Sequence, residues 1–339
     1  MNSMNSEISV VILNYNGVKH LQNYLSEVVK YSAEAQVVII DNASTDNSIN
    51  YIEENYPEIQ LIILEKNLGF ANGYNKGLKF VKSTYYILLN NDVRVSKNWI
   101  SPLIEGLKKS EIAGCQPKIL SDRNTSYFEH AGASGGFIDK DFFPFCRGRI
   151  FDSIEKDKQQ YNHELDVFWV SGAAFAIKAE IFNKVNGFDE RFFAHMEEID
   201  LCWRVQNLGF KFMAIPSSVV YHYGGGTLGY ESSSKIYLNF RNNLFMIFKN
   251  YNGFIIPKLF RRMSLDFLAA FKFLFSGKFN FFFSVFLAHI NFYKNIPSLL
   301  KQRKTLPKKR SNELIGLYKK SILVSYFLKK KKNFNELKF

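Results

Sequence analysis

The first 90 residues alternate between short runs of β-branched and aliphatic residues and stretches with helical periodicity. The apolar runs predict buried strands over residues 8–13, 37–40, 59–64 and 85–89. The periodic stretches between them predict helices over about residues 18–31, 46–55 and 70–82. Strands and helices in this alternation favour an α/β fold, in which helices cover a mostly parallel sheet.

Polar residues follow three of the predicted strands directly. The first strand ends in Asn14-Tyr15-Asn16-Gly17, the second is followed by an acidic turn over residues 41–46, and the fourth by Asn90-Asn91-Asp92. Any one of these turns would also fit an ordinary surface loop, since loops are generally polar. Ligands of parallel sheets bind beyond the carboxyl ends of the strands. We therefore expect the three turns together to form a binding site.

The second part of the chain contains three further features. Residues 167–177 predict a strand with small residues in its middle, which often marks the close approach of a backbone or a ligand. Asp200 and Arg204 have the i, i+4 spacing of a helical ion pair. Residues 219–221 predict a short strand, and His222 stands at its end, before a run of glycines.

Seven blocks occur in order between about residues 8 and 250: VVILNYNG, VVIIDNASTDNS, NLGFANGYNKGL, LLNND, SGAAFAIK, FDERFFAHMEEIDLCWR and VVYHYGGGT. Together they resemble the family 2 glycosyltransferases, and in particular the bacterial rhamnosyltransferase-like enzymes that build surface polysaccharides. The resemblance implies a GT-A-type, mostly parallel sheet flanked by helices over residues 1–250. Residues 251–339 would form an amphipathic helical, basic C-terminal region.

By this resemblance the protein is an inverting glycosyltransferase. It would move a hexosyl or deoxyhexosyl group from a UDP- or dTDP-linked nucleotide sugar to a saccharide carried on polyprenyl diphosphate. A competing interpretation is a nucleotide-sugar-binding protein that keeps the fold but has lost catalysis. The turn Asn90-Asn91-Asp92, which has one acidic residue where the family has a DxD-type pair, motivates that alternative.

The resemblance also implies a divalent cation, Mg or Mn, bound by Asp92 and His222. Such a cation neutralises the charge that develops on the leaving diphosphate. One carboxylate and one imidazole are few ligands, so the diphosphate oxygens and water must complete the shell. We therefore expect the metal to bind weakly without nucleotide. Taken alone, His222 would also fit a structural histidine at the end of a strand.

The same resemblance identifies residues that bind the donor, and it places Asn90 at the ribose and Asp41 at the base or ribose. Asp41 would also fit a simple Asx turn. Glycines in the NLGFANGYNKGL block would let the backbone approach the nucleotide closely. The predicted donor-binding residues are Asn14, Asn16, Asp41, Gly69, Gly73, Asn75, Asn90 and Asn91.

An inverting transfer needs a base that deprotonates the attacking hydroxyl. The family places it in an acidic pair at the start of a helix, which here is Glu197-Glu198. Glu198 occupies the base position, as Glu where Asp is common, and the choice between the two glutamates stays open. Carboxylates at a helix N-terminus also have a purely structural explanation, because the helix dipole stabilises them. Predicted acceptor-binding residues are Trp169, Gly172 and Trp203, although Trp203 would equally fit the core.

The C-terminal region is basic and rich in phenylalanine. Residues 301–339 carry 13 Lys and Arg against two acidic residues, and residues 254–300 hold 12 of the 34 Phe. Within residues 254–300, the longest stretch without a formal charge is residues 279–293, which is shorter than the ~20 residues that span a membrane. The pattern predicts one or two amphipathic helices on an anionic membrane surface. The alternative is a helical subdomain on the catalytic core with a solvated basic tail.

The expected location is the cytoplasm, peripheral on the inner face of the cell membrane. The N-terminus has neither the basic region nor the apolar run of a secretory signal. The three cysteines of the chain are far apart and odd in number, which fits a reducing compartment; they are Cys115, Cys146 and Cys202. No nucleic acid is expected as a partner, since the body lacks any recognisable nucleic-acid-binding module.

Overall fold

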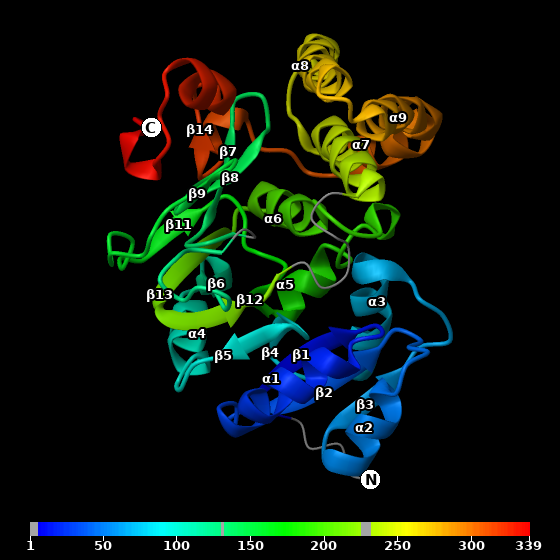
Figure 1. Ribbon diagram of the computed structural model, residues 1–339, viewed down its shortest axis with the longest axis vertical. Coiled ribbons are helices and arrows are strands. Elements are labelled where there is room, and N and C mark those ends of the chain that lie inside the picture. The colour runs from blue at the N-terminus through cyan, green and yellow to red at the C-terminus, as the bar shows by residue number, and fades with distance from the viewer. Residues whose placement is uncertain (1–5, 130–131, 225–231) are drawn as a thin grey trace.

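The computed structural model describes residues 6–129, 132–224 and 232–339 (Figure 1). The strands of its main sheet are β1 (Ile8–Asn14), β2 (Gln36–Asp41), β3 (Gln60–Ile63), β4 (Tyr85–Asn90), β5 (Val93–Val95), β6 (Ile112–Ser121), β11 (Leu165–Val167), β12 (Ala174–Lys178) and β13 (Lys211–His222). Their order is β11-β13-β6-β12-β4-β1-β2-β3, with β5 beside β13. β1 to β4 pair in parallel, and β12 joins them antiparallel to β4.

The helices fall into two groups: the first six accompany the main sheet, and the last three pack on one another at one end of the molecule (Figure 1). They are α1 (Val18–Lys30), α2 (Ser48–Asn55), α3 (Gly69–Gly77), α4 (Ile100–Leu107), α5 (Ala179–Lys184), α6 (Glu197–Asn207), α7 (Ser233–Asn250), α8 (Ile255–Phe275) and α9 (Phe279–Thr305). Short 3-10 or π turns are η1 (Leu78–Phe80), η2 (Glu190–Phe192), η3 (Ser311–Glu313), η4 (Val324–Leu328) and η5 (Phe334–Glu336).

The N-terminal half matches the predicted strands and helices closely. Strand β1 is buried on both faces: Val10 and Ile12 lie in one hydrophobic cluster, while Val11 faces the other, beside Tyr74 of α3. Burial on both faces explains why this strand is an unbroken apolar run with no polar alternation. The predicted α/β class with a mostly parallel N-terminal sheet is confirmed.

Two predicted strands are wrong in their extent. Of residues 167–177, only Val167 at the end of β11 and residues 174–177 of β12 lie in strands, because the backbone between them leaves the sheet. There the amide of Ser171 donates to the side chain of Gln116, 2.8 Å away. The short strand predicted at residues 219–221 belongs to β13, which is much longer and contains an irregularity between Ile215 and Val219. Pro216 and the following serines at this bulge hide the strand pattern in the sequence.

A second, smaller sheet includes a strand from the C-terminal segment. It consists of β7 (Gly136–Asp139), β8 (Pro144–Cys146), β9 (Arg149–Ile150), β10 (Ser153–Ile154) and β14 (Leu317–Tyr318). β14 pairs in parallel with β7, so the C-terminal segment lies on the body of the molecule (Figure 1). Phe334 and Phe339 pack against Phe137, with ring centroids 4.7 and 5.2 Å away. Part of the basic tail is therefore anchored by aromatic contacts.

The phenylalanine-rich region forms two long helices, α8 and α9, and α9 lies against α7 (Figure 1). The prediction of one or two helices in this region is thus confirmed, and the structure has two. Within the described ranges, no helix combines the length and the apolar character needed to cross a bilayer. The predicted boundary at residue 250 coincides with the end of α7, and the division into two domains stays a prediction.

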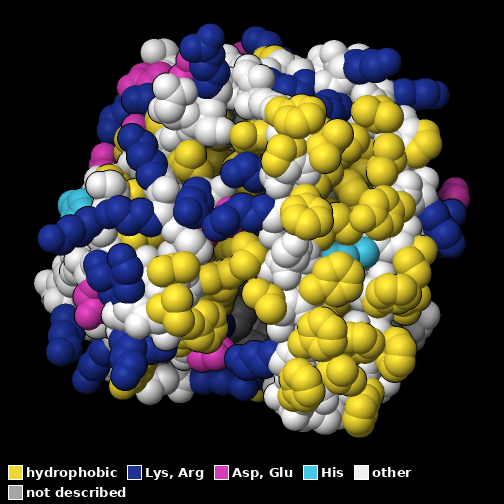
Figure 2. Space-filling model, turned by 90° about the horizontal axis from the view of Figure 1, so that it is seen from above, with side chains coloured by type: hydrophobic (Ala, Val, Ile, Leu, Met, Phe, Trp, Pro, Cys, Tyr) yellow, Lys and Arg dark blue, Asp and Glu magenta, His cyan; other side chains and the backbone are white. Residues whose placement is uncertain are grey.

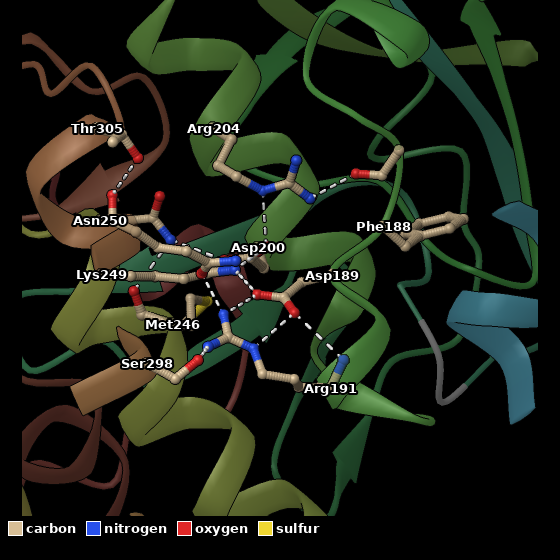
Figure 3. Close-up of polar contacts among 12 residues, drawn as sticks. Phe188, Asp189, Arg191, Asp200, Arg204, Met246, Lys249, Asn250, Ser298 and Thr305 are labelled. Atoms are coloured by element: carbon tan, nitrogen blue, oxygen red, sulfur yellow. Dashed lines mark hydrogen bonds and ion pairs between the residues drawn. The ribbon is translucent and has the colours of Figure 1, made fainter. Parts of the chain in front are cut away.

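A buried network of charges fixes α6 against α7 (Figure 3). Lys249 Nζ of α7 lies 2.8 Å from Asp200 Oδ2 of α6 and also contacts Asp189. Arg204 Nε lies 2.8 Å from Asp200 Oδ2, which confirms the ion pair predicted from the i, i+4 spacing. Arg191 pairs with Asp189 at 2.6 Å and reaches α9 through a further hydrogen bond. Because each buried charge meets an opposite one, the start of α6 is held in one position.

Candidate active site

The carboxyl ends of β1, β2 and β4 meet, and their polar side chains form one hydrogen-bonded group. The amide nitrogen of Asn14 donates to Asp41 Oδ2 at 3.0 Å, while its oxygen accepts from Asn91 Nδ2 at 2.8 Å. Asp41 is fully buried and also accepts from the backbone and hydroxyl of Ser44, both at 2.7 Å. The structure therefore brings three of the predicted donor-binding residues together, and their role toward a donor stays a prediction.

The remaining donor-binding candidates surround this group. Asn16 is exposed, and its side chain accepts from the backbone of Thr45 at 2.7 Å. Gly69 has φ +73°, and a Cβ there would lie 2.7 Å from the carbonyl oxygen of Phe193. Gly73 packs against Leu13. These glycines allow α3 to approach its neighbours closely.

Asn75 has a different environment from the other candidates. Its Nδ2 donates to the carbonyl of Phe188 at 2.8 Å, and its Oδ1 accepts from the amide of the same residue at 3.0 Å. Both polar atoms thus hold the loop before α6, so the structure gives no support to a contact with the donor.

Asp92, His222 and Glu129 lie together at the edge of the main sheet. Asp92 follows β4 and His222 ends β13, which places His222 Nε2 3.0 Å from Asp92 Oδ1. On the other side of the ring, Nδ1 lies 3.3 Å from Glu129 Oε2. All three side chains are buried. Burial alone would lower the pKa of His222, but the two carboxylates raise it to about 10. His222 lowers the pKa of Asp92 in return, against the effect of burial.

This arrangement fits a divalent cation by its chemistry. Carboxylate oxygens suit Mg and Mn, and an imidazole nitrogen extends the choice toward softer metals. In the described part of the chain, no group of three or more His, Cys, Asp or Glu is arranged so that it could hold a metal ion by itself. A cation held by Asp92 and His222 would displace the proton of His222, because metal ligands must be deprotonated.

Glu129 was not among the residues predicted from the sequence. It lies in a loop with no motif around it. The amide of Glu129 donates to the carbonyl of Ile119 in β6 at 3.1 Å, and β6 pairs with β13, which ends in His222. The final motif, VVYHYGGGT, extends beyond His222 into Gly225 and Gly226, which lie outside the described residues.

The acidic pair Glu197-Glu198 opens α6 after a turn with unusual backbone geometry. Phe193, His195 and Met196 have φ of 56°, 68° and 71°, values that side-chain-bearing residues rarely adopt. Such a turn persists only where its surroundings hold it in place, and it is found most often at functional sites.

Asn242 of α7 holds this turn. Its Nδ2 lies 2.9 Å from the carbonyl oxygens of Phe192 and Ala194 and 2.7 Å from that of His195. Asn242 is fully buried, so its amide ties the carbonyls of the turn to the inside of α7. The amide of Phe70 in α3 donates to the carbonyl of Phe193 at 2.7 Å, which joins the turn to α3.

The two glutamates differ in their surroundings. Glu197 is buried, and burial followed by the charge of Glu198 raises its pKa well above the ordinary value. Glu198 is half-buried and lines a pocket, and burial raises its pKa to about 7. In each side chain, the buried Oε2 has no hydrogen-bond partner among the described residues. Glu198 is thus a carboxylate that can exchange a proton near neutral pH.

Gly172 lies between the acidic pair and Asn90, one of the predicted donor-binding residues. A Cβ on this residue would lie 4.0 Å from the carboxyl carbon of Glu198. The next residue, Ala173, accepts a hydrogen bond from the amide of Asn90 at 2.9 Å. The small residues noted in the sequence therefore mark a backbone that passes between the two halves of the site.

The pocket beside Glu198 has a volume of about 960 Å³. Trp169 lines it, and its Nε1 donates to the carbonyl of Phe137 at 2.9 Å, which fixes the ring. Trp203 is buried between Phe142 and Phe168 and is only 1% exposed. Of the two tryptophans, the structure places Trp169 at the pocket and Trp203 in the core, where it gives no support to acceptor binding.

The fold and this site define a class of protein. The chain is similar to the crystal structure of GalNAc-T7 with UDP, GalNAc and Mn2+, with a TM-score of 0.56, 18% identity, and coverage of 74% of this chain and 49% of that chain. It is also similar to the mannosyltransferase PcManGT from Pyrobaculum calidifontis in complex with GDP-Man and Mn2+, with a TM-score of 0.51, 12% identity, and coverage of 97% and 89%. The molecule has the GT-A fold of nucleotide-sugar glycosyltransferases.

The chain belongs to glycosyl transferase family 2, whose model matches residues 9–184, more than half of the chain. A curated relative, the N-acetylglucosaminyl-diphospho-decaprenol L-rhamnosyltransferase of Mycobacterium tuberculosis, is 23% identical over 266 residues, which are 74% of this chain and 87% of the relative. The resemblance to family 2 and to rhamnosyltransferase-like enzymes is thereby confirmed. The protein is a glycosyltransferase.

The turn before α6 generates a prediction about Asn242. Asn242→Ala removes the buried donor that the carbonyls of Ala194 and His195 share and should lower the free energy of unfolding by about 2 kcal/mol. The freed turn admits water to Glu198, so the pKa seen in the pH profile of activity should fall below about 7. Urea denaturation and a pH–rate profile measure the two effects.

Asn250→Ala is the matched control. Asn250 is equally buried in α7 but donates to Asp200 at 2.7 Å, away from the turn. It should lose stability without a shift of the pH profile. Identical pH profiles for the two variants would contradict the role assigned to Asn242.

Proposed function

We propose that this protein transfers a hexosyl or deoxyhexosyl group, with inversion, from a UDP- or dTDP-linked sugar to a saccharide carried on polyprenyl diphosphate. The observation that carries the proposal is Glu198, a half-buried carboxyl with its pKa near 7, which lines a pocket next to the nucleotide side of the site. A base in this position can act on an acceptor while the donor lies across Gly172.

In the proposed reaction, Glu198 accepts the proton of the acceptor hydroxyl as the oxygen attacks the anomeric carbon. The new bond forms on the face opposite to the departing nucleoside diphosphate, so the configuration inverts. The group formed by Asn14, Asp41 and Asn91 would hold the nucleoside, and Asn90 the ribose. Glu197 is more deeply buried than Glu198 and has the more strongly raised pKa, so it would stay protonated during turnover.

Asp92 and His222 would hold a Mg or Mn ion with the donor diphosphate. When bound, such an ion supplies a positive charge that stabilises the leaving group. Both neighbouring structures contain Mn2+, which supports a divalent cation of this kind. The direct contact between Asp92 and His222 is consistent with weak metal binding until the diphosphate adds its own oxygens.

The acceptor class is supported by the relative from Mycobacterium tuberculosis, whose name gives N-acetylglucosaminyl-diphospho-decaprenol as its acceptor and rhamnose as its sugar. An acceptor of this kind has a long lipid chain and remains in a membrane. We infer that this protein meets it on the inner face of the cell membrane, as a peripheral protein.

The surface of α8 and α9 supports the membrane location. Figure 2 looks onto this end of the molecule and shows hydrophobic side chains gathered on one side, with many Lys and Arg on the other. Large apolar residues on these helices are strongly exposed, with Phe260 at 74% and Phe275 at 85%. A cluster of exposed apolar side chains on a protein surface commonly marks contact with another protein or with a membrane. The neighbouring cations favour anionic lipid.

Glu198 is tested by comparing Glu198→Gln with Glu197→Gln. We expect kcat of Glu198→Gln to fall about 100- to 10,000-fold, the usual contribution of a general base. In the wild type, kcat/KM should rise with pH up to about 7 and then level off, because the base acts only when deprotonated. Sugar transfer from a panel of nucleotide sugars with Mn, measured by nucleoside diphosphate release, provides the readout.

Glu197→Gln is the matched control, since it removes the other carboxyl of the same pair and should keep most activity. Asp92→Asn should bind Mn in the presence of nucleoside diphosphate at least about tenfold more weakly, measured by titration. Equal activity of the wild type and Glu198→Gln would contradict the assignment of the base. Donor binding by the wild type without any turnover would instead favour a binding protein that has lost catalysis.

Membrane contact is tested by flotation with vesicles. Phe260→Ser combined with Phe275→Ser should reduce binding to phosphatidylglycerol vesicles at least about tenfold, since each change removes a large apolar side chain from the contact. Phe80→Ser, which changes an exposed phenylalanine distant in sequence from these helices, is the control and should float like the wild type. Undiminished flotation of the double variant would refute contact through α8.

A further inference from the structure

An apolar groove leads from the acidic pair to the surface. Its walls come from α7, α8, the β8 strand and the C-terminal turn η4, and its volume is about 960 Å³. Leu268 of α8 and Phe327 and Leu328 of η4 line it and are 66%, 51% and 75% exposed. Figure 2 shows the hollow on the same face as the exposed phenylalanines of α8 and α9. The groove thus opens toward the surface assigned to the membrane.

The inner end of the groove is polar. Glu198 and His195 line it there, and Trp169 forms part of the wall. Burial and the positive charge of Lys235 lower the pKa of His195 to about 4, which places Lys235 close to this end. A chain lying in the groove would therefore have its head group beside Glu198.

Four cations line the groove: Arg149 of β9, Lys235 of α7, and Arg262 and Lys272 of α8, of which Arg262 is paired with Asp266. Burial and then the charge of Arg149 lower the pKa of Lys235, while the charge of Glu129 raises it, so Arg149 and Glu129 both lie near Lys235. Arg149 Nε donates to the carbonyl of Phe151 at 2.7 Å, which orients the guanidinium. Two cations held together favour an anion with several charges, such as a diphosphate.

We propose that this groove binds the acceptor lipid: the first isoprenoid units lie between α8 and η4, and the diphosphate lies at Arg149 and Lys235. The inference rests on the proposed function, because the saccharide must then reach Glu198. The chemistry of the groove supports this occupant. A carboxyl, the cations Arg149 and Lys235, and apolar side chains of α8 and η4 line one groove, and the acceptor presents a sugar hydroxyl, a diphosphate and a hydrocarbon chain.

The groove also differs from the outer surface of α8 and α9 in what it can bind. Exposed side chains such as Phe260 and Phe275 can contact a membrane collectively, whereas a groove bounded on both sides can hold a single chain. A pocket of this size with few polar groups is typical of a site for one apolar ligand.

The test measures binding of farnesyl diphosphate, a soluble isoprenoid diphosphate, to the full chain without donor. Ala269 of α8 is half-buried in the groove, and Ala269→Trp fills the channel. We expect it to weaken binding at least about tenfold, and Lys235→Gln to do the same through the diphosphate. Ser264→Trp adds the same side chain on an exposed part of α8 and should bind as tightly as the wild type.

Leu265→Trp is a second change in the groove wall, and it should weaken binding even if Ala269→Trp does not fold. Thermal unfolding is measured for each variant. Farnesol and inorganic diphosphate should each bind more weakly than farnesyl diphosphate, since each occupies only part of the site. The inference is overturned if the wild type does not bind farnesyl diphosphate, if the filled variants bind it unchanged, or if phosphatidylglycerol displaces it at equal concentration.

This experiment separates the groove from the proposed function. If the wild type transfers sugar to a short-chain acceptor but does not bind farnesyl diphosphate, lipid binding in the groove is refuted and the proposed glycosyl transfer is not. A wild type that binds farnesyl diphosphate in the groove but transfers sugar to no acceptor refutes the proposed function alone. In transfer assays, Ala269→Trp should raise KM at least about tenfold for an acceptor carried on an isoprenoid chain.

Discussion

The geometry of the site depends on hydrogen bonds from α7 that fix the turn before α6. Three turn residues adopt left-handed backbone conformations, and Asn242 compensates by donating to the carbonyls of this turn. Lys249, two helical turns further along α7, fixes α6 itself through Asp200. The turn and the helix together bury two carboxyls side by side, which raises the pKa of both Glu197 and Glu198.

The sequence was sufficient to predict the parts of this fold that are local. Strand β1 is a continuous apolar run, and Asp200 and Arg204 are one helical turn apart, so each could be inferred from neighbours along the chain. The long-range parts were not predictable. Glu129 reaches His222 through its hydrogen bond to β6 and the pairing of β6 with β13, and nothing in its immediate sequence indicates this. Trp203 illustrates the converse, since its motif indicated function and its packing is that of a core residue.

The two halves of the site suit two kinds of substrate. On the nucleotide side, fully buried polar groups such as Asp41 are held in place by Asn14, which favours a rigid, polar ligand. On the other side, Glu198 opens into an apolar groove beside exposed aromatic helices. A transferase that joins a soluble donor to a lipid-linked acceptor needs both environments, and the backbone at Gly172 is the boundary between them.

The central claim, single displacement assisted by Glu198, is tested most directly by the configuration of the product. The donor is an α- or β-linked nucleotide sugar, and the anomeric configuration of the transferred sugar can be determined by NMR. The account predicts that the configuration inverts, because one carboxyl acts as base and none of the described residues is assigned as a nucleophile. Retention of configuration would contradict it.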